Sequence, residues 1–284
     1  MDMISGLRDA ASTNKRPMHN ELVAAFSLEG RTAVVTGAGG GIGRATAITY
    51  AQAGAFVVLA DVLDAGLAET AALVAGVGGT TLVIRTDVSD KSQVDDLARG
   101  AVRSSGRIDV WANVAGIIRS GSLLELTEAD LDAVLNVNLK GTIWGCAAAG
   151  RIMKSAQRGS IINVASAGGE MPAPTLTAYG TSKAGIVQLS RIVAAELGPF
   201  GIRCNTVAPG FVDTPMTQRM WVASDGSVDE AQRAAAMGVR SAQSPLGITG
   251  QPTDISYAML YLAADASKFM TGEVIRPNGG VHMA

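Results

Sequence analysis

The chain is poor in aromatic residues and cysteines, and it carries almost no net charge. Aromatic side chains make up 4 % of the 284 residues, and the formal net charge is −2. Proteins that bind nucleic acid usually carry an excess of lysine and arginine, so no nucleic-acid partner is expected. The two cysteines, Cys146 and Cys204, offer neither a disulfide framework nor the spacing of a metal site. We therefore expect a cytoplasmic protein without a metal centre.

Long apolar runs are missing as well. No stretch approaches the ~18 apolar residues that a membrane-spanning helix needs. The apolar run from Leu22 to Phe26 is too short for the core of a signal peptide. Residues 1–29 are interpreted as an N-terminal extension, with a short helix around Asn20 to Phe26. Contact with a membrane is not expected.

Glycine and apolar residues, by contrast, are abundant. The chain contains 34 glycines, and hydrophobic residues make up 48 % of it, enough for a large core. From residue 30 onward, short apolar segments alternate with helical segments. This pattern predicts one doubly wound α/β domain over residues 30–284, with a parallel sheet and helices on both faces. The predicted strands cover residues 31–36, 55–60, 80–85, 108–112, 160–165, 201–207 and 273–277, and the predicted helices cover 44–53, 64–77, 90–104, 127–155, 178–197 and 252–264.

The first predicted strand leads directly into a glycine-rich turn. Backbone amides in such a turn can approach a phosphate, and the N-terminus of the following helix adds its positive end. The spacing departs from the G-x-G-x-x-G pattern, because positions 42 and 44 hold isoleucine and arginine. A glycine run alone is compatible with a plain tight turn. The neighbouring residues therefore decide whether it is interpreted as a phosphate-binding turn. The candidate phosphate-binding residues are Gly37, Gly39, Gly41, Ile42 and Gly43.

A carboxylate supports binding of a dinucleotide. Asp61 ends the second predicted strand, twenty residues after Gly41. A carboxylate there can accept hydrogen bonds from the adenosine ribose hydroxyls, and it repels a 2′-phosphate. The sequence therefore favours NAD over NADP. Arg44 is the counter-argument, because a cation beside the turn could favour a phosphate; its other interpretation is a solvated helix residue.

Further candidate residues follow the later predicted strands. In a parallel sheet, ligands bind beyond the carboxyl ends of the strands, so these residues are expected to gather at one edge. They are Asp87 with Val88, the segment Asn113 to Gly116, and Ser166.

Tyr179 and Lys183 form the candidate proton-transfer pair. They are four residues apart in a predicted helix, which puts both side chains on one face. A phenol with a pKa of about 10 is a poor base, and an ammonium group beside it lowers that pKa. Ser166, thirteen residues before the tyrosine, could hold an alcohol or carbonyl oxygen during proton transfer. Interconversion of alcohol and ketone also needs a hydride, and hence a cofactor.

Two segments leave alternatives open. Residues 215–250 break the alternation and contain Met216, Met220, Trp221 and Met237. They are interpreted either as a lid over an apolar substrate or as an amphipathic helix packed on the body. Asn138 lies inside the long helical region 127–155, where asparagine is unfavourable, so it marks either a bent turn or a tolerated polar residue.

The order of these motifs resembles the short-chain dehydrogenase/reductases, from about residue 30 to residue 280. The resemblance implies a Rossmann-type domain with seven parallel strands. It also implies a homotetramer in which the helices around 127–155 and 178–198 pair across one interface. The motifs are Thr36-Gly37-x-x-x-Gly41-Ile42-Gly43, Asp87-Val88, Asn113-x-Ala115-Gly116, Asn138, Ser166, Tyr179-x-x-x-Lys183 and Pro209-Gly210-x-x-x-Thr214.

The resemblance also assigns roles to residues. Tyr179 would be the catalytic acid and base, and Ser166 would orient the substrate oxygen. Lys183 would lower the pKa of Tyr179 and hold the nicotinamide ribose, while Asn138 would keep a water in a proton relay. Val212 and Thr214 would contact the carboxamide, and Asp87 with Val88 the adenine. The expected cofactor-binding residues are Gly37, Gly39, Gly41, Ile42, Gly43, Asp61, Asp87, Val88, Asn113, Ala115, Gly116, Tyr179, Lys183, Pro209, Gly210, Val212 and Thr214.

The sequence departs from the family pattern at two places. Val114 stands where the family often has a second asparagine. Arg276-Pro277-Asn278 stands where an acidic residue before the paired glycines is commoner, which could alter a subunit contact or the substrate edge.

We expect an NAD(H)-dependent oxidoreductase that interconverts a secondary alcohol and a ketone of an apolar small molecule. An NADP(H)-dependent carbonyl or 3-oxoacyl reductase is the first alternative. A non-catalytic dinucleotide-binding sensor is the second, although it would need a damaged catalytic set.

Overall fold

The computed structural model describes residues 19–223 and 225–283. The expectation of a short helix near the N-terminus is confirmed by α1, Asn20–Phe26. The remainder of the predicted N-terminal extension, residues 1–18, lies outside the described residues. Within the described part of the chain, no helix is both long enough and apolar enough to cross a membrane.

The predicted parallel sheet is confirmed. Its seven strands have the order β3-β2-β1-β4-β5-β6-β7, and all the pairings are parallel. The strand order reverses between β1 and β4, and in doubly wound sheets ligands bind beyond the carboxyl ends of the strands at such a reversal. The strands are β1 Thr32–Thr36, β2 Phe56–Asp61, β3 Thr80–Arg85, β4 Val110–Asn113, β5 Gly159–Val164, β6 Ile202–Val207 and β7 Val274–Ile275.

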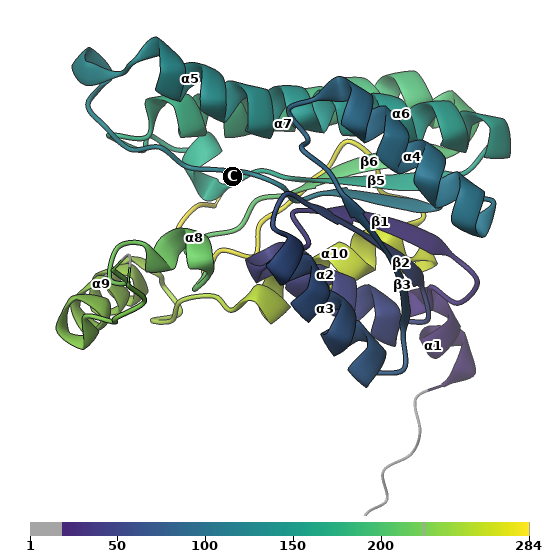
Figure 1. The fold of residues 1–284 in the computed structure, drawn as a ribbon, viewed down its shortest axis with the longest axis horizontal. Coiled ribbons are helices and arrows are strands. Elements are labelled where there is room, and N and C mark those ends of the chain that lie inside the picture. The colour runs from purple at the N-terminus through teal and green to yellow at the C-terminus, as the bar shows by residue number, and fades with distance from the viewer. Residues whose placement is uncertain (1–18, 224, 284) are drawn as a thin grey trace, which may run out of the picture.

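Helices cover both faces of the sheet, as the doubly wound pattern predicts (Figure 1). Each face has its own apolar core. In β1, Val35 belongs to one core and Val34 to the other, so successive side chains alternate between the two layers. One layer contains α2 Gly41–Gln52, α3 Asp64–Gly76 and α10 Pro252–Ala263, and the other contains α4 Lys91–Ser105, α6 Gly141–Ala156 and α7 Thr177–Leu197.

Two of the differences from the predicted boundaries bear on the site. The helix after the glycine turn begins at Gly41 rather than at Arg44, so the last glycines form its first turn. The final strand contains only Val274 and Ile275, and Pro277, which has no amide hydrogen to donate, follows shortly after it.

The predicted helix over 127–155 is broken. It consists of α5 Glu128–Val134, a π-helical segment, η4 Leu135–Lys140, and α6. Asn138 lies within the π-helical segment and is fully buried. The helix therefore departs from regular α geometry at this asparagine, and no bend is shown.

Residues 215–250 contain two helices at one end of the molecule (Figure 1). They are α8 Pro215–Gln218 and α9 Glu230–Gln243. Trp221 between them is 3 % exposed, whereas α9 buries none of its residues. Arg233 of α9 nevertheless lies 3.7 Å from Asp213, so both interpretations of this segment, the lid and the packed helix, stay predictions.

Candidate active site

The glycine turn and the end of β4 lie against each other. The Thr36 hydroxyl accepts hydrogen bonds from the amides of Val114 and Ala115, at 3.1 and 3.2 Å. Gly37 has a φ of +69°, and a Cβ atom there would lie 2.8 Å from the backbone of Ala115. The carboxyl ends of β1 and β4 are thereby joined at the sheet edge where the sequence predicts the site.

The turn fits the phosphates of a dinucleotide. A Cβ atom on Gly43 would overlap the carbonyl oxygen of Gly37, so a side chain at this position would displace the turn. No side chain caps the N-terminus of α2, which begins at Gly41. The amides of the first helical turn are therefore available to an anion, together with the positive end of the helix dipole.

Asp61 and Arg44 both form hydrogen bonds with the backbone of Gly39. The Asp61 carboxylate accepts a hydrogen bond from the Gly39 amide at 2.9 Å. The Arg44 guanidinium donates to the Gly39 carbonyl at 2.7 Å and to both carboxylate oxygens of Glu69, at 2.6 and 2.7 Å. Its Nε atom donates to the hydroxyl of Thr70 at 3.1 Å. The interpretation of Arg44 as a merely solvated residue is therefore wrong.

Ser166, Tyr179 and Lys183 meet where β5 ends and α7 begins. Burial raises the pKa of Tyr179, and its interaction with the Ser166 hydroxyl lowers that pKa. Burial also lowers the pKa of Lys183 to about 8. The Lys183 ammonium donates to the carbonyl of Val164 at 2.8 Å and lies 5.7 Å from the Tyr179 ring centre.

The side chain of Lys183 extends to the end of β5, where the carbonyl of Val164 accepts its hydrogen bond. Burial is the largest influence on the pKa of Tyr179 and raises it. The expectation that Lys183 lowers the pKa of Tyr179 stays a prediction.

Asn138 joins this group from the π-helical segment. Its side chain accepts from the Ile117 amide at 2.8 Å and donates to the Ser182 hydroxyl at 3.0 Å. Ser182 in turn donates to the carbonyl of Tyr179 at 2.7 Å. A Cβ atom on Gly116 would lie 3.3 Å from the Asn138 side-chain oxygen and 3.5 Å from the Lys183 nitrogen. All four candidate catalytic residues are thus brought together.

Relatives of known sequence match almost the whole chain. A model of the family described as enoyl-(acyl carrier protein) reductase matches residues 37–282. The 3-oxoacyl-(acyl-carrier-protein) reductase FabG of Thermotoga maritima is 37 % identical over 254 residues, which cover 89 % of this chain and 98 % of the relative. A (3R)-3-hydroxyacyl-CoA dehydrogenase of Canis lupus familiaris is 36 % identical over 271 residues, which cover 92 % of this chain and 100 % of the relative.

Solved structures agree with this match. A short-chain type dehydrogenase/reductase from Mycobacterium marinum has a TM-score of 0.84 at 33 % identity, covering 92 % of this chain and 98 % of its own. The chain belongs to the short-chain dehydrogenase/reductase family. Levodione reductase, with a TM-score of 0.83 at 32 % identity, covers 89 % of this chain and 97 % of its own. As a member of this family, the protein is an oxidoreductase that acts on CH–OH groups with a nicotinamide dinucleotide.

Asn113, a predicted cofactor contact of this short-chain dehydrogenase/reductase, has its side chain in hydrogen bonds within the protein. Asn113 accepts from the indole of Trp111 at 2.8 Å and donates to the side chain of Asn163 at 2.8 Å. It also donates to the sulfur of Cys146, which belongs to α6. The side chain of Asn113 is therefore buried between β4 and α6, where it fixes the end of the strand.

The remaining predicted cofactor residues line the same edge. Asp87 accepts hydrogen bonds from the amide and hydroxyl of Ser89, at 2.9 and 2.7 Å, and Val88 is buried beside Gly141. Thr214 caps α8, and its side chain would lie 3.3 Å from a Cβ atom on Gly41. The short helix α8 therefore packs over the glycine turn. Pro209, Gly210 and Val212 occupy the turn between β6 and α8.

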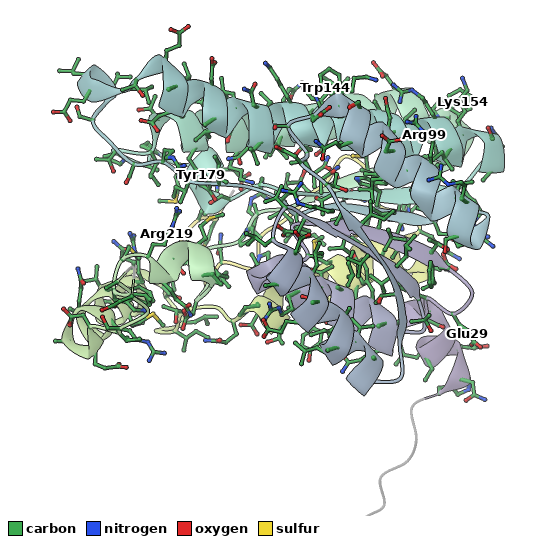
Figure 2. All side chains as sticks on the ribbon, viewed as in Figure 1. Glu29, Arg99, Trp144, Lys154, Tyr179 and Arg219 are labelled. Atoms are coloured by element: carbon green, nitrogen blue, oxygen red, sulfur yellow. The ribbon has the colours of Figure 1, made fainter. Side chains whose placement is uncertain are left out.

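The walls of the site come from three loops of the short-chain dehydrogenase/reductase fold. The carbonyl of Thr175, which has a positive φ of 69°, accepts from the Gly121 amide at 2.9 Å. Arg219 donates to the carbonyl of Ile118 at 3.5 Å, which connects the segment after α8 to the loop after β4. Figure 2 shows Tyr179 and Arg219 at the same end of the molecule.

Sequence reasoning missed two contributors to this region. Ser182 could have been found, because it lies three residues after Tyr179 and next to Lys183. The contact between Glu170 and Arg276 gives no sequence signal, because the two residues are 106 positions apart. Among residues 19–223 and 225–283, no cluster of three potential metal ligands occurs.

Proposed function

We propose that this protein is an NAD(H)-dependent dehydrogenase/reductase that interconverts a secondary alcohol and a ketone. The observation that carries the proposal is the meeting of Ser166 and Tyr179 beside Lys183, next to a glycine turn that fits a dinucleotide. Two relatives support a hydroxyl or oxo group as the reacting centre, because their names specify a 3-oxoacyl reductase and a 3-hydroxyacyl-CoA dehydrogenase.

The proposed chemistry moves a proton at the tyrosine oxygen. In oxidation, the Ser166 hydroxyl holds the substrate oxygen while the Tyr179 oxygen accepts the hydroxyl proton; in reduction, Tyr179 donates that proton. The bound nicotinamide supplies the hydride acceptor or donor. We propose that the positive charge of Lys183, 5.7 Å from the Tyr179 ring centre, favours the phenolate and so opposes the effect of burial on the pKa of Tyr179.

A proton path behind the tyrosine is also proposed. The Asn138 side-chain oxygen and the Lys183 ammonium both lie beside Gly116. We assign to Asn138 the role of holding a water that exchanges protons with Lys183. Its side chain is fixed by Ile117 and Ser182, so the position of such a water would be constant.

The contacts of Asp61 and Arg44 support NAD as the cofactor. The Asp61 carboxylate lies beside the turn, where it can accept hydrogen bonds from ribose hydroxyls. The cation beside it, Arg44, is held by Glu69 and Thr70, so its charge is largely neutralised. We further propose that the nicotinamide ribose binds Lys183, the carboxamide binds Val212 and Thr214, and the adenine lies against Asp87 and Val88.

NADP is the second candidate for the cofactor. A putative 2-deoxy-d-gluconate 3-dehydrogenase from Agrobacterium tumefaciens, whose structure holds NADP, has a TM-score of 0.79 at 31 % identity to this chain. The observation in this chain that favours NADP is the contact of Arg44 with the Gly39 carbonyl, which keeps a cation next to Asp61.

The surroundings of the site support two further proposals. The segment from α8 to α9 acts as a lid over an apolar substrate, because α8 packs over the glycine turn while α9 stays exposed. The protein also forms a homotetramer through the helical regions 127–155 and 178–198. Light scattering of the purified protein tests the tetramer, and a monomeric mass would contradict it.

The decisive experiment measures cofactor choice and turnover together. Titration with NADH and with NADPH, followed by nicotinamide fluorescence, is expected to give the tighter binding with NADH. A panel of secondary alcohols and 3-hydroxyacyl thioesters is then assayed for NADH formation, with Tyr179→Phe as the inactive control. Binding of NADH without turnover of any substrate would favour a non-catalytic dinucleotide-binding sensor. Tighter binding of NADPH than of NADH would favour NADP as the cofactor.

A further inference from the structure

An ion pair connects the loop after Ser166 to the C-terminal segment. Arg276 donates from Nε and Nη2 to the carboxylate of Glu170, at 3.0 and 2.6 Å, and from Nη1 to the carbonyl of Val274 at 3.1 Å. The side chains of Arg276 and Glu170 are only 24 % and 11 % exposed, so solvent and salt screen the pair incompletely. An arginine that bonds both oxygens of a carboxylate also fixes their relative orientation.

A single turn of chain separates this pair from the candidate catalytic serine. Glu170 ends the 3₁₀ turn η5, Ala167–Gly169, and its amide donates to the carbonyl of Ala167 at 3.0 Å. At the start of the same turn, the Ser166 hydroxyl accepts from the Gly168 amide at 3.1 Å. A Cβ atom on Gly169 would lie 2.7 Å from the backbone of Lys183, so the turn is packed tightly against α7.

Two backbone contacts complete a closed ring around the site. The Ala167 amide donates to the carbonyl of Pro209 at 2.9 Å, and the Gly210 amide donates to the carbonyl of Pro277 at 3.3 Å. Since Pro277 directly follows Arg276, the ion pair closes the ring back to the serine turn. The ring therefore links three segments that are distant in sequence: the serine turn, the turn after β6 and the C-terminal segment.

We propose that Glu170 and Arg276 are positioning residues, whose ion pair sets the place of Ser166 relative to Tyr179 and to the Pro209–Gly210 turn. The inference rests on the proposed function, because it concerns the alignment of the same site. It gives a role to the segment from Arg276 to Asn278, which departs from the commoner family pattern. The pair acts through the serine turn and does not itself take part in proton transfer.

The test neutralises each partner in turn. Glu170→Gln and Arg276→Met are each expected to lower kcat by about tenfold, because misplacement of a reacting group slows the chemical step. The Kd for NADH should change by less than about threefold, since the glycine turn and Asp61 are untouched. The double variant should be no slower than either single variant, because both changes remove the same contact. Arg276→Lys, which keeps the charge, should recover part of the rate.

A matched control removes an ion pair at the opposite edge of the sheet. Arg31 pairs with Asp265 and, like Arg276, is mostly buried. Arg31→Met should lower the melting temperature while leaving kcat at the parent value. If Glu170→Gln and Arg31→Met alter kcat equally, the effect is one of general stability and the proposal is overturned.

Crystal structures of the parent and of Glu170→Gln separate this inference from the proposed function. The distance between the Ser166 hydroxyl and the Tyr179 hydroxyl is expected to change in the variant, and this readout needs no substrate. Absence of turnover in the parent would count against the proposed function alone. An unchanged distance would overturn the positioning role. Should Glu170→Gln fail to fold, Arg276→Met provides the same distance and the same kinetic comparison.

Discussion

Glu69 holds Arg44 through both of its carboxylate oxygens, at 2.6 and 2.7 Å, although the two residues are 25 positions apart. This pair keeps the guanidinium of Arg44 on the Gly39 carbonyl and reduces the positive charge beside Asp61. We propose that Arg44, Asp61 and Glu69, two of which carry a negative charge, govern the choice between NAD and NADP.

Removal of Glu69 should make the protein more tolerant of NADP. In Glu69→Ala, the charge of Arg44 is no longer neutralised and can attract a 2′-phosphate. The ratio of the Kd for NADPH to the Kd for NADH should fall by roughly tenfold, the effect of about one new charge-assisted hydrogen bond. Fluorescence titration measures both constants. In the double variant Glu69→Ala with Arg44→Ala, the ratio of the two Kd values should return to that of the parent. If the ratio stays low, Arg44 is not the source of the change.

Replacement of the tyrosine should abolish turnover without preventing cofactor binding. Tyr179→Phe removes only the hydroxyl that exchanges the proton, so kcat should fall by about a thousandfold. The Kd for NADH should remain within about threefold of the parent value, because the glycine turn is unchanged. Steady-state kinetics and fluorescence titration provide the two readings. A variant that kept most of its rate would show that another group is the base.

Lys183 should make the stability of the cofactor-free protein depend on pH in the alkaline range. Its pKa is lowered by burial from 10.5 to about 8, so between these values the unfolded chain binds more protons than the folded one. The free energy of unfolding should therefore rise with pH over this window, by at most about 3 kcal/mol from this residue. Below pH ~8 both states are protonated, and the contribution is constant.

Urea unfolding of the parent and of Lys183→Met at several pH values measures this contribution. The difference between the two free energies of unfolding should increase in favour of the parent from pH ~8 to pH ~10.5. A difference that stays level across this range would mean that the folded protein does not perturb the lysine.

The glycine turn should not accept even one methyl group. In Gly43→Ala the new Cβ atom overlaps the carbonyl oxygen of Gly37, so the turn must shift and the phosphate-binding amides shift with it. We expect the Kd for NADH to rise by about a hundredfold, the equivalent of two or three lost hydrogen bonds. Gly76→Ala is the matched control, since nothing lies within 4 Å of its new Cβ atom. That control should bind NADH normally and gain up to about 1 kcal/mol of stability.

The sequence predicts the sheet and the location of the site well, because both depend on local patterns. Alternating apolar and helical segments identify the strands, and the carboxyl ends of parallel strands lie at one edge. The contact between Ser166 and Tyr179 follows from the same reasoning. Local patterns do not reveal the distant hydrogen-bond partner of a side chain. The position of Arg44 depends on such a partner, Glu69.

The same limit applies to Asn113 and Lys183, whose predicted roles stay proposals. Position after a strand does not say on which face of the sheet a side chain lies, and that of Asn113 lies toward α6. Helical spacing puts Lys183 on the face of Tyr179, but its long side chain continues to the Val164 carbonyl, 19 residues away. Sequence spacing thus gives the neighbourhood of a functional group, whereas its hydrogen-bond partners require the assembled fold.

The π-helical segment Leu135–Lys140 makes the site unusually sensitive to chain length. A π turn contains one more residue than an α turn, and here that extra residue lies in the segment that carries Asn138. Deletion of one residue here would restore a regular α-helix while the flanking helices keep their faces, so the change would fall on the segment that carries Asn138 itself. Asn138 would lose its contacts with Ile117 and Ser182. In this part of the chain, a change in residue count is therefore more damaging than most changes of residue type.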